Sequence, residues 1–238
     1  MIISKRNIFL MMVLIMVIIY IIQSVRIGPF APRFCDLFEG ESSNKYADLV
    51  RKLNSYSICK DTQYDVFEKY IYWKGEIIGG VIDNILVFKG SDTIQDWLYD
   101  LTLHKSKRLI SNIELIYDEI KERVNTVIDD YNVTAITGWS LGAIISCMCA
   151  VDTHHKIDNV VLFGLPNIFT TDFVELYNSK LGTKTQVYNN RFDIFVNAFG
   201  YGKMPHHIKK TIWINPPVLE SHKLLTKGLG HFHLSYMR

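Results

Sequence analysis

The sequence predicts an α/β domain with a mostly parallel sheet that carries helices on both faces, and three observations lead to this prediction. Strand-like runs of apolar and β-branched residues alternate with segments of helical periodicity. At Gly138 one strand-like run passes through a Gly-x-Ser-x-Gly turn straight into a helix-like run. The chain has 238 residues, enough for one such domain with a sizeable core.

The first part of the domain predicts a helix followed by three strands. Residues 46–53 place Ala47, Val50 and Leu53 on one helical face. Strands are expected at residues 70–73, 77–81 and 85–88, and the last two are joined by a turn at Asp83-Asn84.

The second part alternates between helix and strand. A helix is expected over residues 112–130, with Ser111 as a plausible N-cap. Its apolar stripe consists of Ile113, Ile116, Ile120, Val124, Val127 and Ile128. Further strands are expected at 133–138, 160–164, 185–189 and 208–214, and further helices at 141–151 and 172–179. Parallel strands gather functional groups at their carboxyl ends, which is where Ser140 lies in this arrangement.

The strand-turn-helix around Ser140 has the form of a nucleophile elbow. Such a turn strains the serine backbone and lifts its hydroxyl clear of the sheet. Gly138 and Gly142 occupy the two places where a Cβ would collide with a neighbouring strand or helix. The Leu141 amide, at a helix N-terminus, would then point toward a developing oxyanion.

The N-terminal segment predicts a membrane-spanning helix. Lys5 and Arg6 precede an apolar run from Ile8 to Ile22, which would be about 22 Å long as a helix. A cleaved secretory signal has the same charged start, but residues 22–26 offer no Ala-x-Ala-like site. We expect an uncleaved signal anchor at 1–27, a linker at 28–39 and the domain at 40–238 on the non-cytoplasmic side of a membrane. Secretion after cleavage is the alternative.

The net charge of the chain bears on its possible binding partners, and its cysteines bear on the compartment in which it resides. A net charge of +2, without a long basic run, gives no case for a nucleic-acid partner. Cys35 and Cys59 could form a disulfide in an oxidising compartment, whereas Cys147 and Cys149 are expected to be buried free thiols. Asn132-Val133-Thr134 is a glycosylation sequon. His154-His155 and His206-His207 lack a carboxylate or cysteine at ligand spacing, so no metal is expected.

A serine nucleophile needs a base, and the base needs an orienting acid. Following Ser140, the chain order of this type of fold is an acid and then a histidine. Asp193 fits the acid best because it follows a strand end, whereas Asp158 and Asp172 are less well placed. Spacing alone leaves five histidines open as the base: His206, His207, His222, His231 and His233.

Five segments, taken in order, carry a resemblance to a known family. They are Phe88-Lys89-Gly90-Ser91 leading into Asp96-Trp97, Gly138-Trp139-Ser140-Leu141-Gly142-Ala143, Phe163-Gly164-Leu165-Pro166, Asn190-Arg191-Phe192-Asp193-Ile194 and His233-Leu234-Ser235-Tyr236. Together they resemble the class 3 lipases, the fungal triacylglycerol-lipase-like branch of the α/β-hydrolases. The resemblance covers roughly residues 40 to 238.

The resemblance implies a role for each matched residue. Ser140 would be the nucleophile, Asp193 the acid and His233 the base, with His231 as its nearest rival. His207 matches a family histidine that is not catalytic. Ser91 would join Leu141 in the oxyanion hole. The stripe of Ile94, Trp97, Leu98 and Leu101 would form an amphipathic lid that opens at a lipid surface.

The family pattern has departures here, and they bear on the shape of the pocket. Lys89 replaces an arginine, Trp139 replaces a histidine and would crowd the elbow, and Phe195 breaks the segment after the acid. The sequence nevertheless predicts a cofactor-free serine ester hydrolase, or lipase, that acts on acylglycerols or phospholipids at a membrane or lipid-water interface. The alternatives are an esterase or thioesterase for small acyl substrates, and a non-catalytic lipid- or partner-binding protein on a lipase scaffold.

Overall fold

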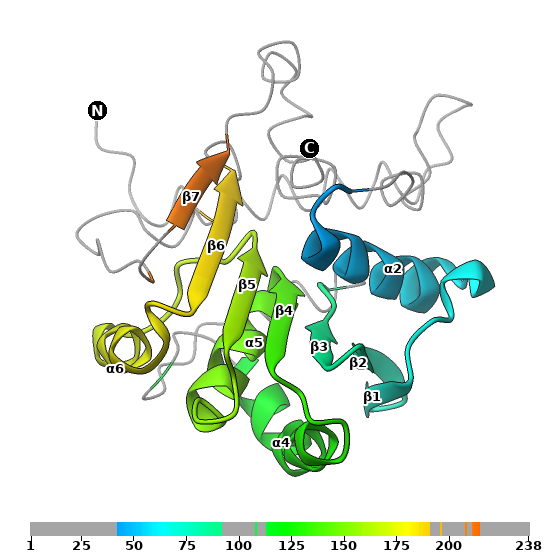
Figure 1. The fold of residues 1–238 in the computed structure, drawn as a ribbon, viewed down its shortest axis with the longest axis horizontal. Helices are drawn as coiled ribbons and strands as arrows, with labels where there is room; N and C mark the ends of the chain where they lie inside the picture. The colour runs from blue at the N-terminus through cyan, green and yellow to red at the C-terminus, as the bar shows by residue number, and fades with distance from the viewer. Residues whose placement is uncertain are drawn as a thin grey trace, which may run out of the picture.

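The computed structural model describes residues 42–91, 108, 113–190, 196, 208 and 211–214. Within these residues a single seven-stranded sheet has its strands in chain order, β1-β2-β3-β4-β5-β6-β7 (Figure 1). β1 (Lys69–Trp73), β2 (Glu76–Ile82) and β3 (Ile85–Phe88) pair in antiparallel fashion. β3 then pairs in parallel with β4 (Ala135–Trp139), and the parallel ladder continues through β5 (Asn159–Phe163), β6 (Thr185–Asn190) and β7 (Thr211–Ile214). This confirms the α/β fold with a mostly parallel sheet.

The described helices lie on both faces of the sheet, as predicted. α4 (Ile113–Asp130), α5 (Leu141–Asp152) and α6 (Thr171–Leu181) each connect two neighbouring parallel strands. Because right-handed crossovers between strands in sequential order place their helices on the same side, these three share one face. α2 (Lys45–Cys59) covers the opposite face, where Val50 and Leu53 join a cluster with strand residues such as Val87 and Val161 (Figure 1). η2 (Thr62–Tyr64) is a short 3-10 turn after α2.

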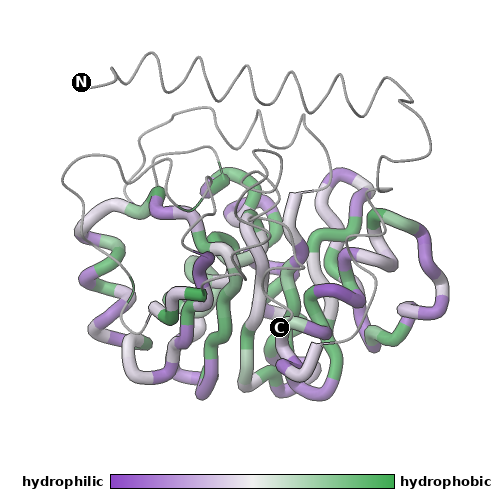
Figure 2. The backbone as a smooth tube through the Cα atoms, turned by 90° about the horizontal axis from the view of Figure 1, so that it is seen from above, coloured by the Kyte–Doolittle hydropathy of each residue, from purple (hydrophilic) through white to green (hydrophobic). Residues whose placement is uncertain are grey.

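Two apolar cores follow from the alternation of side chains along the strands. On β4, Ile136 joins the core beneath α4, α5 and α6, whereas Ala135 and Trp139 join the core beneath α2. Hydrophobic residues run along the inner strands in Figure 2, and hydrophilic ones gather at the outer turns and helix faces. Each face of the sheet therefore carries apolar side chains that the helices on that face bury.

Local chemistry explains where the elements begin and end. Asn44 caps α2 by accepting from the Tyr46 amide at 3.0 Å, and Lys60 ends the helix in the left-handed conformation at φ 57°. α2 thus runs six residues past the predicted end at Leu53. β7 begins at Thr211, three residues later than predicted, and the other shared boundaries differ by two residues or fewer.

The predicted signal anchor and linker stay predictions. Both fall within residues 1–41, which lie outside the described part of the chain. Among the described residues no helix is both long and apolar enough to cross a membrane. Cys59 is disulfide-bonded, while Cys147 and Cys149 are buried free thiols as predicted; Cys35, the remaining cysteine, is outside the described residues.

Candidate active site

Ser140 lies in a sharp turn between β4 and α5. Its φ of 55° and ψ of −118° fall in a region that residues with a Cβ rarely adopt. The Ser140 amide donates to the Phe163 carbonyl at 3.0 Å, and the Ser140 carbonyl accepts from the Ala143 amide at 3.0 Å. The strained residue is therefore fixed on one side to β5 and on the other to the first turn of α5. Its side chain is largely buried, at 4% exposure.

The two glycines of the motif are required by close backbone contacts. A Cβ on Gly138 would lie 2.4 Å from the Gly142 carbonyl oxygen. A Cβ on Gly142 would lie 2.3 Å from the Phe88 carbonyl oxygen and 2.4 Å from that of Lys89. Real Cβ atoms do not approach backbone this closely, so β4 approaches the start of α5 only with glycine at 138, and the elbow packs against the end of β3 only with glycine at 142.

The first turn of α5 begins directly after Ser140. Leu141 and Gly142 are its first residues, and amides at these positions have no acceptor within the helix. The Ser146 hydroxyl holds the turn against β4, because it lies 2.7 Å from the Gly142 carbonyl oxygen and 3.2 Å from that of Thr137. The predicted oxyanion residue Leu141 therefore occupies a position with the chemistry that role requires.

The segment after β3 passes close to the elbow and contains Ser91, the other predicted oxyanion residue. Lys89 and Ser91 are both buried. Asn54 of α2, fully buried, accepts from the Gly90 amide at 3.3 Å and donates to the Val50 carbonyl at 2.9 Å. A side chain on the far side of the sheet thus fixes the residue that precedes Ser91.

Trp139 does not point into the elbow, so the expectation that it crowds this turn is wrong. Its side chain is 1% exposed and belongs to the core beneath α2. Side chains alternate along a strand, so residue 139 faces away from the helix that follows Ser140. The indole packs against Gly90, where a Cβ would lie 2.4 Å from the ring. The bulky residue is accommodated because its neighbour is glycine.

The end of β5 is tied to the end of β6 by an asparagine side chain. Oδ1 of Asn189 accepts from the Leu165 amide at 2.9 Å, and Nδ2 donates to the Leu165 carbonyl at 3.4 Å. A small pocket lies here; Leu165, Pro166, Phe169, Ile208 and Thr211 are among the residues that line it. This pocket sits at the carboxyl edge of the sheet, the same edge as Ser140.

The structure describes only part of the predicted site. Ser140, Leu141 and Ser91 lie at the carboxyl edge of the sheet. The acid Asp193 and all five candidate bases, His206, His207, His222, His231 and His233, lie outside the described residues. The predicted lid residues Ile94, Trp97, Leu98 and Leu101 lie outside them too. The two less favoured acids are on the surface, Asp158 beside Lys184 and Asp172 in the first turn of α6.

Sequence reasoning missed Asn54 and Asn189. Both bond to backbone groups distant in sequence, Asn54 to a residue 36 positions away and Asn189 to one 24 positions away. A polar residue within an otherwise apolar pattern indicates that it has a hydrogen-bond partner, but the sequence does not show which distant residue that partner is.

Other titratable groups have structural roles. Among the described residues no three of His, Cys, Asp and Glu gather closely enough to hold a metal ion. Burial raises the pKa of the Cys149 thiol to about 12 and that of the Cys147 thiol well above its ordinary value, so neither is a reactive thiolate.

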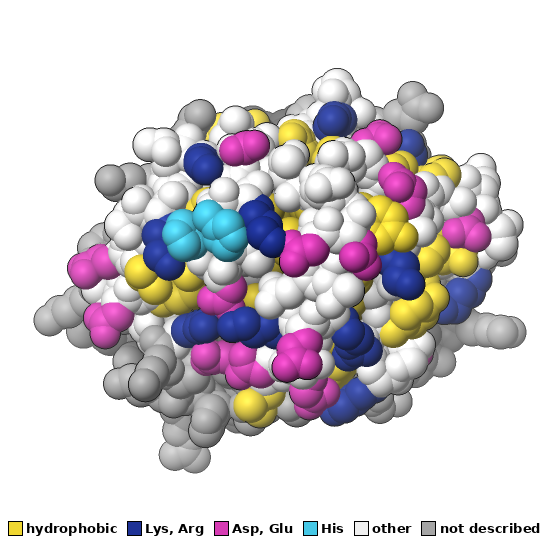
Figure 3. Space-filling model, turned by 60° about the horizontal axis from the view of Figure 1, so that its bottom comes forward, with side chains coloured by type: hydrophobic (Ala, Val, Ile, Leu, Met, Phe, Trp, Pro, Cys, Tyr) yellow, Lys and Arg dark blue, Asp and Glu magenta, His cyan; other side chains and the backbone are white. Residues whose placement is uncertain are grey.

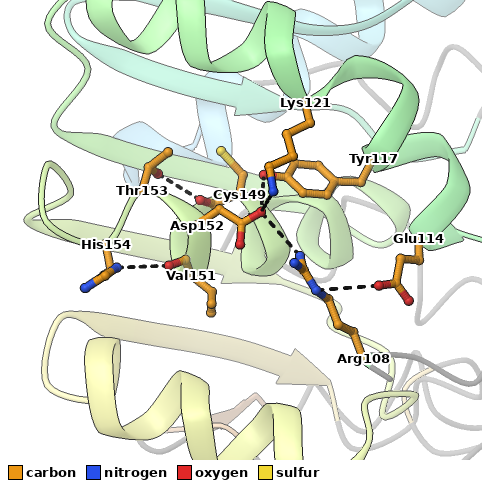
Figure 4. A network of polar contacts seen from close by, with 9 residues as sticks. All are labelled: Arg108, Glu114, Tyr117, Lys121, Cys149, Val151, Asp152, Thr153 and His154. Carbon is orange, nitrogen blue, oxygen red and sulfur yellow. Dashed lines mark hydrogen bonds and ion pairs between the residues drawn. The ribbon is translucent and has the colours of Figure 1, made fainter. Parts of the chain in front are cut away.

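A charged cluster fastens the end of α5 opposite Ser140 (Figure 4). The Asp152 carboxylate lies 2.6 Å from Nζ of Lys121, accepts from the Tyr117 hydroxyl at 3.1 Å and pairs with Arg108, which also reaches Glu114. Burial alone would raise the pKa of Asp152; the hydrogen bond from Lys121 and the charge of Arg108 outweigh it and leave the pKa lowered. The surrounding face mixes acidic and basic side chains (Figure 3).

The chain is similar to known lipases. Residues 85–200 match the family described as Lipase (class 3). Among solved structures, the triacylglyceride lipase of Rhizomucor miehei has a TM-score of 0.54 at 19% identity, covering 71% of this chain and 78% of that one. The Lip2 lipase of Yarrowia lipolytica has a TM-score of 0.51 at 14% identity, covering 75% and 82%. At these identities the structural likeness shows a shared fold. Comparison with curated protein sequences finds no significant match.

Proposed function

We propose that this chain, whose residues 85–200 belong to the class 3 lipase family, is a serine ester hydrolase with Ser140 as its nucleophile. The observation that carries the proposal is the backbone of Ser140, strained at φ 55° and ψ −118° between β4 and the N-terminus of α5. A protein maintains such strain where the surroundings over-determine it, and nucleophile elbows are places where it serves a purpose.

The proposed reaction proceeds through an acyl-enzyme. His233 takes the proton from the Ser140 hydroxyl as Oγ attacks the ester carbonyl, and then returns it to the leaving alcohol. Water, deprotonated by the same imidazole, attacks the acyl-enzyme and releases the carboxylic acid and the free serine. Asp193 holds the imidazole in the required tautomer. The support for Asp193 and His233 is the order and composition of their segments.

The oxyanion in this proposal is held by Ser91 and the Leu141 amide. Their support is the burial of Ser91, the fixing of Gly90 by Asn54, and the position of Leu141 at the start of α5. Removing one such donor typically costs about 3 kcal/mol of transition-state stabilisation. Ser91→Ala is therefore expected to lower kcat by roughly a hundredfold, with KM little changed.

The proposed substrates are carboxylic esters of acylglycerols or phospholipids at a lipid-water interface. This rests on the family match and on the amphipathic stripe of Ile94, Trp97, Leu98 and Leu101 as a lid. A lipase of this kind turns over dispersed long-chain esters faster above their solubility limit than below it. An esterase or thioesterase for small substrates would show no such activation.

We also propose that residues 1–27 anchor the protein in a membrane, with the domain on the non-cytoplasmic side. The disulfide at Cys59 supports an oxidising compartment. Asn132 is exposed in the turn after α4, so its sequon is available as a topology reporter in a eukaryotic host. The expected result is a mobility shift upon glycosidase treatment that Asn132→Gln abolishes. An unmodified, protease-accessible domain on the cytoplasmic side would contradict this topology.

The decisive test of the function is labelling of the full chain by a fluorophosphonate. The probe should modify the wild-type protein and not Ser140→Ala. Ser179→Ala is a matched control, because Ser179 is an exposed serine whose hydroxyl bonds locally to Leu176. Labelling that survives Ser140→Ala would overturn the assignment. A folded wild-type protein without labelling or ester turnover would favour a binding protein on a lipase scaffold.

A further inference from the structure

Asn189 replaces a strand partner at the point where the β5–β6 ladder ends. The regular pairing extends to Phe163 and Tyr188, and the Gly164 amide still donates to the Tyr188 carbonyl at 2.9 Å. Gly164 then turns the chain at φ 57°, so the Leu165 backbone leaves the ladder. The Asn189 side chain is 2% exposed and pairs with both the amide and the carbonyl of Leu165.

A primary amide is suited to this role because it presents one acceptor and one donor side by side, as a peptide group does. Leu165 is itself buried, so its amide and carbonyl would lack water if Asn189 were removed. The bond pair therefore keeps the loop after β5 in register with the end of β6.

The strand from which this loop leaves, β5, is bonded to the elbow at its last residue. The Phe163 carbonyl, two residues before Leu165, accepts from the Ser140 amide at 3.0 Å. In the sequence, Asn189 lies four residues before Asp193. One buried side chain thus connects the end of β6, which precedes the proposed acid in the sequence, with the loop that follows the end of β5, where Phe163 bonds to the proposed nucleophile's amide.

We propose that Asn189 is a positioning residue for this hydrolase: it sets the carboxyl end of β6 relative to the Ser140 turn, and so sets the geometry between nucleophile and acid. This inference rests on the proposed function. Small displacements of catalytic groups cost large factors in rate, so the effect belongs on kcat rather than on KM.

The test compares Asn189→Ala with Asn159→Ala in the full chain. Asn159 is at the amino end of β5, where Nδ2 donates to the Tyr46 hydroxyl at 2.7 Å, so its loss removes a similar bond at the opposite edge of the sheet. Turnover of p-nitrophenyl butyrate and thermal unfolding are measured for both variants. We expect Asn189→Ala to lower kcat by about tenfold or more with KM little changed, and Asn159→Ala to stay within about twofold.

A pH profile separates positioning from a general loss of structure. A carboxylate beside an imidazole stabilises the imidazolium form and so raises the pKa of the histidine. A displaced acid would raise that pKa less, so the acidic limb of kcat/KM should move to lower pH by about half a unit. Asn189→Ser keeps a hydroxyl that can bond to only one of the two Leu165 groups and adds no charge, so it should fall between wild type and Asn189→Ala. If Asn189→Ala does not fold, this second variant is tested instead, by its kcat and by the position of its acidic limb.

The inference is overturned if the folded Asn189 variant keeps kcat within about twofold and an unshifted acidic limb. It is equally overturned if Asn159→Ala lowers kcat as much, since the effect would then be general. Failure of the proposed function gives a different result, because wild type itself would then show neither turnover nor fluorophosphonate labelling.

Discussion

Strain at Ser140 has a thermodynamic cost that can be measured. A non-glycine residue in such a conformation costs of order 1–3 kcal/mol, and the hydrogen bonds to Phe163 and Ala143 hold it there. Glycine adopts the same conformation without a Cβ clash, whereas alanine retains the clash. Serine therefore lowers the stability of the fold relative to glycine at this position, but the proposed chemistry requires its hydroxyl.

Ser140→Gly is predicted to stabilise the fold while it abolishes labelling. Relief of the strain should make Ser140→Gly about 1 kcal/mol more stable than Ser140→Ala, although the greater freedom of unfolded glycine offsets part of the gain. Urea unfolding of the two variants measures the difference. A glycine variant no more stable than the alanine variant would show that the turn is not strained.

Gly142→Ala tests the close contact between the elbow and the end of β3. The added Cβ would meet the carbonyl oxygens of Phe88 and Lys89, and backbone cannot yield as a flexible side chain does. The expected loss is about 3 kcal/mol or more, together with the activity. Gly75→Ala is the control: nothing lies within 4 Å of its Cβ, so only its φ of 86° opposes the change, at about 1 kcal/mol. Equal losses in urea unfolding would contradict the prediction.

Residues of the elbow could be predicted from sequence, and the bonds that brace it could not. Gly138, Ser140 and Gly142 follow a local sequence pattern: the two glycines are required by close backbone contacts, and the serine supplies the hydroxyl. The roles of Asn54 and Asn189 arise only when the sheet brings distant backbone beside them. The prediction that Trp139 crowds the elbow was wrong for the same reason: the residue that makes room for it, Gly90, lies in the segment after β3, distant in sequence.

At the scale of elements, strands and helices were predictable because their apolar periodicity reflects which face is buried. The stripe from Ile113 to Ile128 is buried on α4 as predicted. Boundaries depend on single capping contacts instead, so α2 continues to Cys59 until Lys60 adopts the left-handed conformation. The strand order was not predicted, because alternation of strands and helices favours parallel strands without fixing which strands are neighbours.

The packing of α4 against α5 should depend on pH through Asp152. Its lowered pKa means that its stabilising contribution is complete above the ordinary carboxyl pKa of about 4 and is lost as pH falls through the lower folded value. Asp152→Asn should therefore cost about 1 kcal/mol at pH 7, a modest figure because water reaches Lys121, and progressively less toward pH 3.

Urea unfolding at pH 7, 5 and 3 measures this dependence. Asp129→Asn is the control, because Asp129 pairs with Lys156 on the surface with its side chain 57% exposed, and it should change stability by less than about 0.5 kcal/mol. A constant difference between Asp152→Asn and wild type across these pH values would exclude the carboxylate as the source.

At the scale of the whole molecule, the Cys59 disulfide ties the end of α2 to another part of the chain. Cys147 and Cys149 are free, so we predict Cys35 as the partner. Closing a loop of this length should stabilise the fold by about 3 kcal/mol. Cys35→Ser and Cys59→Ser should each lower the melting temperature and abolish the mobility difference between reduced and non-reduced samples. A difference that persists in Cys35→Ser would identify another partner.

The contact between Gly90 and Trp139 has a consequence for how this sequence can change over time. Any larger residue at 90 would collide with the indole, so that position is open to substitution only after 139 has become smaller. The reverse order leaves a void beneath α2, which is costly but tolerable. The two sites therefore form an epistatic pair with a preferred order of mutation.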